Sequence, residues 1–237
     1  MFRIELNADI GEGCDDASLM PLLDRAAIAC GGHTGDQASM DAALALCAEY
    51  GVLPGAHPSY PDREHFGRRA RVASANDIRH WVSEQTTALA EIAARRGVRL
   101  AHVKPHGALY NAAACDATVA AAIAEAVAAI DPALVLVGLA HSRLTEAGQA
   151  AGLAVLHEAF ADRAYGADGG LVPRETPGAL LAAAAAAAQA RALAEHRPLA
   201  SRDGGELRIE ADTLCLHSDT PGALDIARAV HAALHRR

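Results

Sequence analysis

The sequence has few aromatic residues, no paired cysteines and no excess of positive charge. Aromatic residues make up 3% of the 237 residues, so the core must be built from Ala, Leu, Val and Ile, which suits helices packed tightly on strands. The five cysteines are scattered and form no Cys-x-x-Cys pair, which argues against a disulfide framework and a thiolate zinc site. The net charge of −8 counts against nucleic acid or an anionic membrane surface as a partner.

Long apolar segments are also lacking. The longest run, Ala179 to Ala188, is about half of the ~20 residues that a membrane span needs. The N-terminus runs directly into a strand-like pattern and shows no signal peptide. We therefore expect no membrane role, and the scattered cysteines favour a cytoplasmic location.

Short apolar runs alternate with alanine-rich helical segments along the whole chain. This alternation implies βα units and a parallel sheet, and seven units favour a closed α/β barrel over an open doubly wound sheet. Ser74-x-x-Asp77 resembles a capping box, and Thr176-Pro177 places a cap before a proline. No linker or repeat divides the chain, so residues 1–237 are expected to form one domain. The predicted strands are Phe2–Asn7, Ala26–Cys30, Val52–His57, Val98–Val103, Leu134–Gly138, Leu153–Glu158 and Thr213–His217, with a small extra strand at Glu206–Glu210.

Unusual polar clusters follow the predicted strands at their C-terminal ends. In a parallel α/β barrel these ends meet at one mouth, where such enzymes place their chemistry. Individual residues also have simpler interpretations: a single histidine is more often structural than catalytic, Asp36 suits a helix N-cap, and Arg68-Arg69 suits a solvated loop. The clusters are Asn7–Gly13, Cys30–Asp36, Gly55–Asp62, His102–Asn111, Glu158–Tyr165 and His217–Asp219.

These residues resemble the LamB/YcsF family, whose members include the A subunit of 5-oxoprolinase. The resemblance spans almost the whole chain in order and spacing, and it departs from the family pattern at Gly32, Thr34 and Ser59, on the rim of the expected pocket. The matching segments are Leu6–Gly13, Gly55–Pro58, Phe66–Arg69, His102–Asn111, Phe160–Tyr165, Asp168–Gly169, Leu171–Arg174 and Cys215–His217.

The resemblance implies both a fold and a reaction. The fold is a TIM-like, distorted (β/α)7 barrel of the glycoside hydrolase/deacetylase type. The reaction is the ATP-dependent cleavage of the lactam of 5-oxo-L-proline to L-glutamate, with ADP and phosphate as the other products. The family's A subunit works with partner subunits B and C.

Such a reaction needs cations for phosphate, a base for water and an acid for the leaving group. We expect Asp9 or Asp162 as the base, Lys104 as a compact positive charge, and His57 or His106 as proton shuttles. Arg163 is expected to clamp a carboxylate or phosphate. The predicted catalytic residues are thus Asp9, Lys104, His106 and Asp162, and the predicted substrate-binding residues are Asn7, Glu12, His33, His102, Tyr110, Asn111 and Arg163.

Two alternatives remain open beside this interpretation. Asp9, His57 and His106 come from separate strands and can form a divalent-metal site, which would make the chain a metal-dependent hydrolase of another small amide. The chain can also be a non-catalytic subunit that holds ligand for its partners. ATP is the expected co-substrate of the whole complex. Because the sequence contains neither Gly-x-x-x-x-Gly-Lys-[Ser/Thr] nor Gly-x-Gly-x-x-Gly, we expect phosphorylation to lie with the partners.

Overall fold

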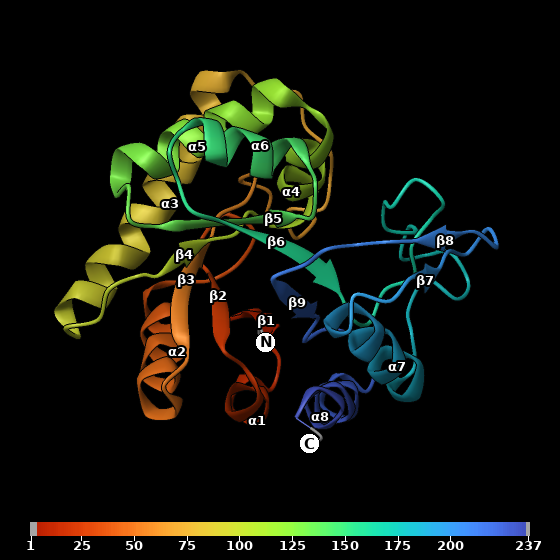
Figure 1. The fold of residues 1–237 in the computed structure, drawn as a ribbon. Coiled ribbons are helices and arrows are strands. Elements are labelled where there is room, and N and C mark those ends of the chain that lie inside the picture. The colour runs from red at the N-terminus through yellow and green to blue at the C-terminus, as the bar shows by residue number, and fades with distance from the viewer. Residues whose placement is uncertain (1–3, 236–237) are drawn as a thin grey trace.

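The computed structural model describes residues 4–235, and its centre is a closed barrel of seven parallel strands (Figure 1). The strands follow one another around the barrel in chain order, and the first closes it by pairing with the last. The predicted α/β barrel is confirmed, and the open sheet is excluded. The barrel strands are β1 (Glu5–Ile10), β2 (Arg25–Ala29), β3 (Leu53–His57), β4 (His102–Val103), β5 (Val135–Leu139), β6 (Val155–Phe160) and β9 (Thr213–Leu216).

All seven predicted strands exist, but the first lies three residues later than expected, and the fourth, predicted over Val98–Val103, is confirmed only at His102 and Val103. The predicted strand Phe2–Asn7 ends at Asn7, whereas β1 continues through Asp9 to Ile10. Residues 2 and 3 of the predicted strand lie outside the described part of the chain. Alternate side chains of a strand point to opposite faces, so Asn7 and Asp9 enter the barrel while Leu6 and Ala8 pack outside it.

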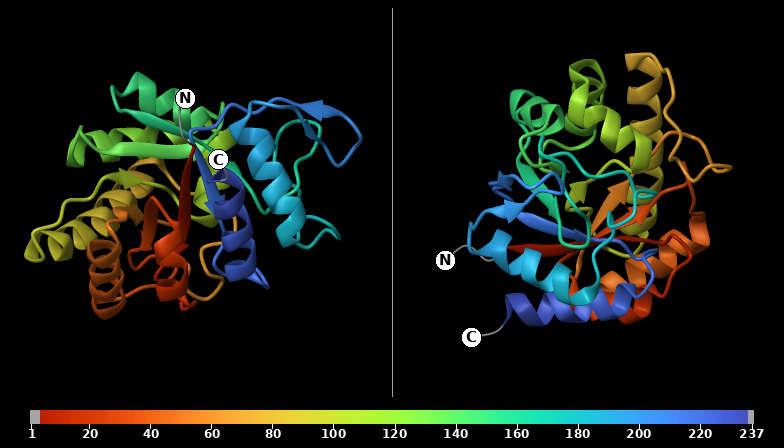
Figure 2. Two further views of the ribbon diagram at one scale, coloured as in Figure 1. Left: turned by 60° about the horizontal axis from the view of Figure 1, so that its bottom comes forward. Right: turned by 90° about the vertical axis from the view of Figure 1, so that its right-hand side faces the viewer.

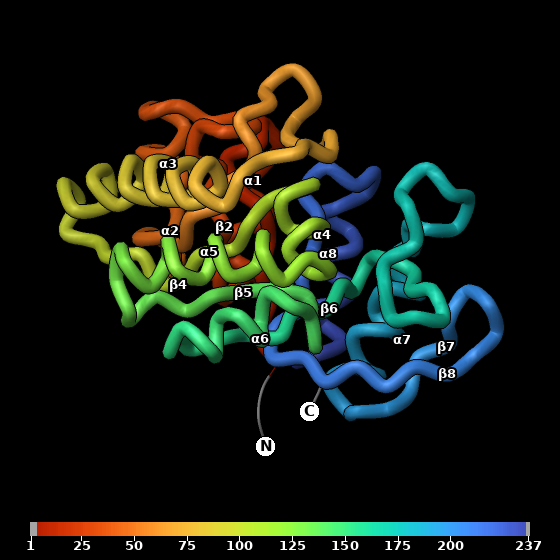
Figure 3. The backbone as a smooth tube through the Cα atoms, turned by 90° about the horizontal axis from the view of Figure 1, so that it is seen from above, coloured from red at the N-terminus to blue at the C-terminus, as the bar shows by residue number. Residues whose placement is uncertain are grey.

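Helices cover the outside of the barrel. Seen from above, α3, α5 and α6 follow one another along one side (Figure 3), and α7 lies beside α8 in both views of Figure 2. The caps predicted at Asp36 and Ser74 are confirmed, each as a capping box. The start predicted at Thr176-Pro177 is wrong, because those residues lie in a loop and α7 begins at Ala183. The helices are α1 (Asp16–Leu19), the 3-10 turn η1 (Met20–Leu22), α2 (Gln37–Tyr50), α3 (Ala75–Arg95), α4 (Gly107–Cys115), α5 (Ala117–Ile130), α6 (Arg143–Ala150), α7 (Ala183–Ala194) and α8 (Ala223–Leu234).

A small lobe projects from one side of the barrel (Figure 1). It contains the two-stranded antiparallel sheet of β7 (Leu199–Ala200) and β8 (Glu206–Leu207), which confirms the first two residues of the strand predicted at 206–210. No single helix in the described range is both long and apolar enough to cross a bilayer, and α4 with α5 meets that test only as a pair bent by 115°.

The barrel interior is filled by layers of polar side chains. At the N-terminal ends of the strands, Arg25 is ion-paired with Glu5. His102 lies above them against Gly55, where a Cβ atom would come within 2.4 Å of the imidazole ring. Glycine is therefore required on β3 for His102 to fit on β4, and the next layer up carries Lys104.

Candidate active site

A cavity of about 510 Å³ opens at the C-terminal ends of the barrel strands, where the sequence places its polar clusters. Its floor is charged and buried, and its rim is formed by the loops that follow the strands. The ionisable residues that line it are Asp9, Glu12, His57, Arg68, Lys104, His106, Tyr110, Cys115, Arg163, Arg174, Glu175, His217 and Asp219, with Asn111 beside them.

Lys104 forms the centre of the first buried cluster in the floor. Its Nζ lies 2.9 Å from Asp9 Oδ1 and 2.9 Å from Glu158 Oε1, and it donates to Asn7 Oδ1 at 3.0 Å. Tyr110 donates its hydroxyl to the other oxygen of Glu158 at 2.7 Å. We call Lys104, Asp9, Glu158, Asn7 and Tyr110 the lysine cluster.

Neighbouring opposite charges keep the carboxylate of Asp9 and the ammonium of Lys104 ionised. Burial alone would raise the pKa of Asp9, but the charges of His57 and Lys104 hold it well below its usual value. Burial alone would lower the pKa of Lys104, but neighbouring groups, Asp9 foremost, raise it well above its usual value. Lys104 is therefore a fixed cation, and Asp9 is a poor base at neutral pH.

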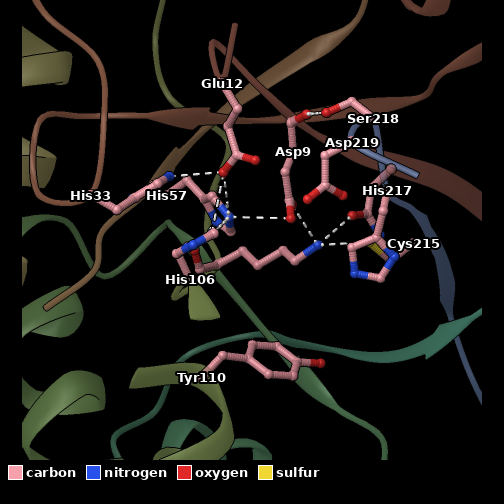
Figure 4. Close-up of polar contacts among 12 residues, drawn as sticks. Asp9, Glu12, His33, His57, His106, Tyr110, Cys215, His217, Ser218 and Asp219 are labelled. Carbon is pink, nitrogen blue, oxygen red and sulfur yellow. Dashed lines mark hydrogen bonds and ion pairs between the residues drawn. The ribbon is translucent and has the colours of Figure 1, made fainter. Parts of the chain in front are cut away.

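A second cluster lies beside the first and contains Glu12, His33, His57 and His106, which we call the histidine cluster. Figure 4 shows these four side chains turned toward one another, with Asp9 between them and the pair Cys215 and His217. Glu12 Oε1 lies 2.8 Å from His33 Nε2, 3.3 Å from His106 Nδ1 and 3.8 Å from His57 Nε2. The rings of His33 and His106 stack with their centroids 3.7 Å apart.

Backbone carbonyls fix the protons of two of these histidines. His57 donates from Nδ1 to the Lys104 carbonyl at 2.7 Å, and His106 donates from Nε2 to the Phe66 carbonyl at 3.0 Å. Phe66 is held for this role in the left-handed region with φ of 54°. The remaining nitrogens, His57 Nε2 and His106 Nδ1, face each other at 2.9 Å. Two lone pairs cannot occupy that distance unless a proton or a cation lies between them.

The pKa shifts assign that proton to His57. Burial alone would lower the pKa of His57, but the carboxylate of Asp9 raises it above its usual value. Burial and the charge of His57 lower the pKa of His106 to about 3, so His106 is neutral and accepts from His57. Burial and the charge of Asp9 raise the pKa of Glu12 to about 7. Glu12 is thus the carboxyl group whose pKa matches a general base at neutral pH.

The histidine cluster also has the composition of a divalent-metal site. A tetrahedral zinc site with bonds of 2.0–2.1 Å separates its ligand atoms by roughly 3.3 Å, close to the spacings among Glu12, His57 and His106. His57 and His106 donate their other ring nitrogen to a carbonyl, as metal-bound histidines do. His33 fits less well, because its buried Nδ1 has no hydrogen-bond partner among the described residues. These donors therefore fit a metal as a three-residue set, with Glu12 in the place that the sequence assigned to Asp9.

The second group with metal-ligand geometry is Asp9, Cys215 and His217. The ammonium of Lys104 already lies there, 3.1 Å from Cys215 Sγ and 2.9 Å from Asp9 Oδ1. A second cation at this place would be repelled by Lys104, so the group is not suited to a metal.

Four of the predicted site residues do not line the cavity: His33, described below, and Asn7, His102 and Asp162, which lie behind its wall. Asn7 holds Lys104 from below, and His102 lies deeper in the barrel with neither ring nitrogen hydrogen-bonded to a described residue. Asp162 is buried behind His217 and accepts from its Nδ1 at 3.0 Å. Burial alone would raise the pKa of Asp162, but His217 lowers it. Asp162 is therefore placed to orient His217, and the prediction of Asp162 as a base that meets the substrate does not fit this geometry.

The other predicted residues gather as expected from their positions after the strands. Asp9, Lys104, His106, Glu12, Tyr110, Asn111 and Arg163 all line the cavity, and His33 lies directly behind Glu12 and His106.

Four residues to which the sequence analysis assigned no role complete the site: Glu158, His217, Arg174 and Asp219. Arg174 and Arg68 both bind the carboxylate of Asp219, Arg174 at 3.0 Å. The basic run around Arg68 suggested a solvated loop, but the side chain of Arg68 turns to the cavity. The signal for Glu158 and His217 was available, since both stand at the ends of predicted strands.

Comparison with known proteins shows to which family the chain is similar. The LamB/YcsF family model matches residues 4–237. A relative from Chloroflexus aggregans, which is named as the A subunit of 5-oxoprolinase, is 48% identical. The match covers 99% of this chain and 96% of the relative. A second relative of that name, from Methylococcus capsulatus, is also 48% identical, with 99% and 93% covered. The crystal structure of the lactam utilization protein from Thermus thermophilus superposes with a TM-score of 0.92 at 41% identity, covering 98% of this chain and 96% of that one.

Proposed function

The chain belongs to the LamB/YcsF family, and on that premise we propose that it is the A subunit of a 5-oxoprolinase, a hydrolase that opens the lactam of 5-oxo-L-proline. The observation that carries the proposal is a similarity that extends over both chains nearly end to end, rather than over the barrel alone. The further proposals are that the reaction consumes ATP, that subunits B and C are its partners, and that it takes place in the cytoplasm.

We assign the opening of the activated ring to this chain, with phosphorylation left to the partners. Once the lactam oxygen carries a phosphoryl group, water can add to the ring carbon, and the C–N bond breaks when a proton reaches the ring nitrogen. The resulting acyl phosphate is then hydrolysed by a second water to glutamate and phosphate. The site must therefore supply a base, an acid and a stabilising positive charge.

Glu12 and Lys104 are suited to these tasks. Glu12 has a pKa of about 7, so it can take the proton from water and return it to the leaving nitrogen. Lys104 stays charged and lines the cavity floor, where its ammonium can stabilise negative charge that develops on the ring carbon's oxygens. The neighbouring Asp9 keeps both His57 and Lys104 in their charged forms.

Reconstitution with partner subunits tests this proposal. The chain is mixed with B and C subunits, 5-oxo-L-proline and ATP, and glutamate and phosphate are followed together. We expect coupled release only when this chain is present, and a loss of roughly 10²-fold or more with Glu12→Gln. The exposed Glu84→Gln is the matched control. Glutamate formation by B and C alone, or coupled turnover by the lone chain, would contradict the assignment.

A metal-dependent amide hydrolase is the second candidate function, because Glu12, His57 and His106 fit a divalent cation. Such a cation would supply a Lewis acid and an activated water without ATP. Measurement of bound metal in protein prepared without chelator separates the two functions. Stoichiometric zinc that is lost in His106→Ala, together with ATP-independent amide cleavage, would favour this second function.

A further inference from the structure

Arg163 is a buried cation that lines the cavity and forms no ion pair with another side chain among residues 4–235. Its side chain follows β6, and the residue is only 7% exposed. Its guanidinium donates to the Val172 carbonyl at 2.7 Å, while its buried Nε has no hydrogen-bond partner among the described residues. Within residues 4–235 no carboxylate oxygen lies within 4.0 Å of this guanidinium. A buried charge of this kind is costly unless an opposite charge meets it.

The surroundings of Arg163 add positive charge. Burial and the nearby charge of Arg174 lower the pKa of Arg163, and the neighbouring carboxylate of Asp162 offsets only part of that effect. Arg174 and Arg68 share a single carboxylate, that of Asp219. The exposed Glu175 lines the same end of the cavity but makes no ion pair with the three arginines in the described structure. All three arginines line the cavity, and Asp219 is ion-paired with Arg68 and Arg174 but not with Arg163.

The backbone around Arg163 is held in place from outside the barrel. Gln189 on α7 donates from Nε2 to the carbonyls of Phe160 and Arg163, each at 2.8 Å. Arg163 also forms a bridge with Leu180 across the loop. This segment therefore fixes the guanidinium at the cavity wall before any ligand arrives, which is the arrangement of a preorganised binding site.

We propose that Arg163, together with Arg174, binds the anionic group of the ligand, and that this group is the carboxylate of a lactam acid. The identity of the ligand as a lactam rests on the proposed function, whereas the anion site rests on the geometry of the arginines. A planar guanidinium can meet a carboxylate through two parallel hydrogen bonds, so a ligand in the cavity can be bound through the terminal nitrogens of Arg163.

The position of Phe160 relates this anion site to the floor of the cavity. Lys104 Nζ lies 6.0 Å from the Phe160 ring centroid, and Arg163 follows Phe160 by three residues. A small cyclic ligand can rest against this ring with its carboxylate toward Arg163 and its amide toward Lys104 and Glu12. The site would then select lactams that carry a carboxylate over neutral lactams of the same ring size.

Calorimetric binding to the lone chain tests this without catalysis. The probes are 5-oxo-L-proline, neutral 2-pyrrolidinone and inorganic phosphate, and the proteins are wild type, Arg163→Gln, Arg163→Lys and the surface control Arg143→Gln. We expect wild type to bind the acid at least tenfold more tightly than the neutral lactam. Arg163→Gln should lose that preference and leave 2-pyrrolidinone binding within twofold, whereas Arg163→Lys should restore part of it.

Each outcome has a distinct meaning. Equal binding of acid and neutral lactam to wild type overturns the proposal whether or not the variants fold, and so does an unchanged preference in a folded Arg163→Gln variant. If phosphate binding depends on Arg163 while 5-oxo-L-proline binding does not, the carboxylate assignment is overturned and the anion is a phosphate. If no lactam binds but phosphate binding is lost with Arg163→Gln, the anion site stands and the lactam function fails.

Discussion

The lysine cluster and the histidine cluster lie side by side in the cavity floor, and they balance their buried charges in different ways. In the lysine cluster the cation is part of the chain, since Lys104 pairs with Asp9 and Glu158 at 2.9 Å. In the histidine cluster no side chain supplies a permanent cation. A proton on His57, or a metal, must fill the space between His57 and His106.

Because of this difference, the two clusters are suited to different chemical tasks. A cation that cannot leave is suited to hold a substrate's developing negative charge throughout a reaction. A position that accepts and releases a proton near neutral pH is suited to acid–base steps. Asp9 lies between the clusters, 2.9 Å from Lys104 Nζ and 3.4 Å from His57 Nε2, so the charge of one cluster sets the protonation of the other.

Removal of the permanent cation should have the largest effect. Lys104→Met leaves Asp9 and Glu158 as unpaired buried carboxylates, which costs about 3–5 kcal/mol of unfolding free energy. Activity in the full complex should fall by roughly 10²–10³-fold. Denaturant unfolding and glutamate release measure the two effects. In the exposed pair Arg99–Asp131, Arg99→Met should leave both unchanged; a similar loss there would remove the distinction between buried and exposed charge.

The histidine cluster should make stability depend on pH near neutrality, whereas the lysine cluster should not. The folded-state pKa of Glu12 is about 7, above its unfolded value near 4.5, and that of His57 is also raised. A raised pKa stabilises the fold at low pH, and that stability is lost as pH rises through the folded value. Asp9 and Lys104 are shifted away from neutrality and keep their charges between pH 5 and 8.

We therefore expect the chelator-treated chain to lose on the order of 2 kcal/mol of unfolding free energy between pH 5 and pH 8. Glu12→Gln keeps an uncharged side chain of the same shape at every pH, so its profile should be flatter over this range. Urea unfolding at several pH values provides the measurement. A wild-type stability that rises with pH would show that the sign of the Glu12 shift is wrong.

Loss of the charge of Asp162 should reduce activity less than changes in either cluster, because Asp162 acts through His217. Asp162→Asn removes the charge that orients His217 without entering the cavity, so kcat should fall roughly tenfold with little change in KM. Thr220→Val is the matched control, because Thr220 meets the same carboxylate through a longer contact of 3.4 Å. Loss as large as that of Lys104→Met would mean that Asp162 itself takes part in the chemistry.

The smallest effect is expected for His102, which lies one layer below the two clusters in the barrel. His102 is buried and neither ring nitrogen has a hydrogen-bond partner in the described structure, so His102→Leu should change unfolding free energy by less than about 1.5 kcal/mol. Activity should stay within a few-fold, as measured by steady-state kinetics. A large loss of activity from this variant would place His102 in the reacting site after all.

The fold and the location of the site were predictable because both follow from repeated local patterns. Seven apolar runs gave the barrel, and the parallel order of strands placed their polar ends at one mouth. The misplaced end of β1 shows the limit of this reasoning: hydrophobicity marks strand faces that pack on helices, and it misses polar residues such as Asp9 that face a barrel interior.

The roles of individual residues depend on distances that the sequence does not contain. Glu12 and Asp162 are both acidic and both follow strands, yet one reaches the cavity and the other is held behind His217. The residue type and position of Asp9 suit a base, but Lys104 and His57 beside it hold its pKa too low for that role. In sequence, Arg68 resembles a surface residue. In the structure its side chain pairs with Asp219, and the two residues before it, Phe66 and Gly67, both have positive φ, which the sequence pattern did not indicate.

The most direct test of the account is a single-turnover experiment on the full complex, reconstituted with either the wild-type chain or its Lys104→Met variant. ADP and glutamate are quantified separately after 5-oxo-L-proline and ATP are added. We expect Lys104→Met to retain a burst of ADP that depends on 5-oxo-L-proline while forming almost no glutamate, because phosphorylation proceeds and ring opening does not. Loss of the ADP burst from a folded, assembled complex would place phosphorylation on this chain. Undiminished glutamate would show that the lysine cluster does not catalyse ring opening and that the chain only holds ligand for its partners.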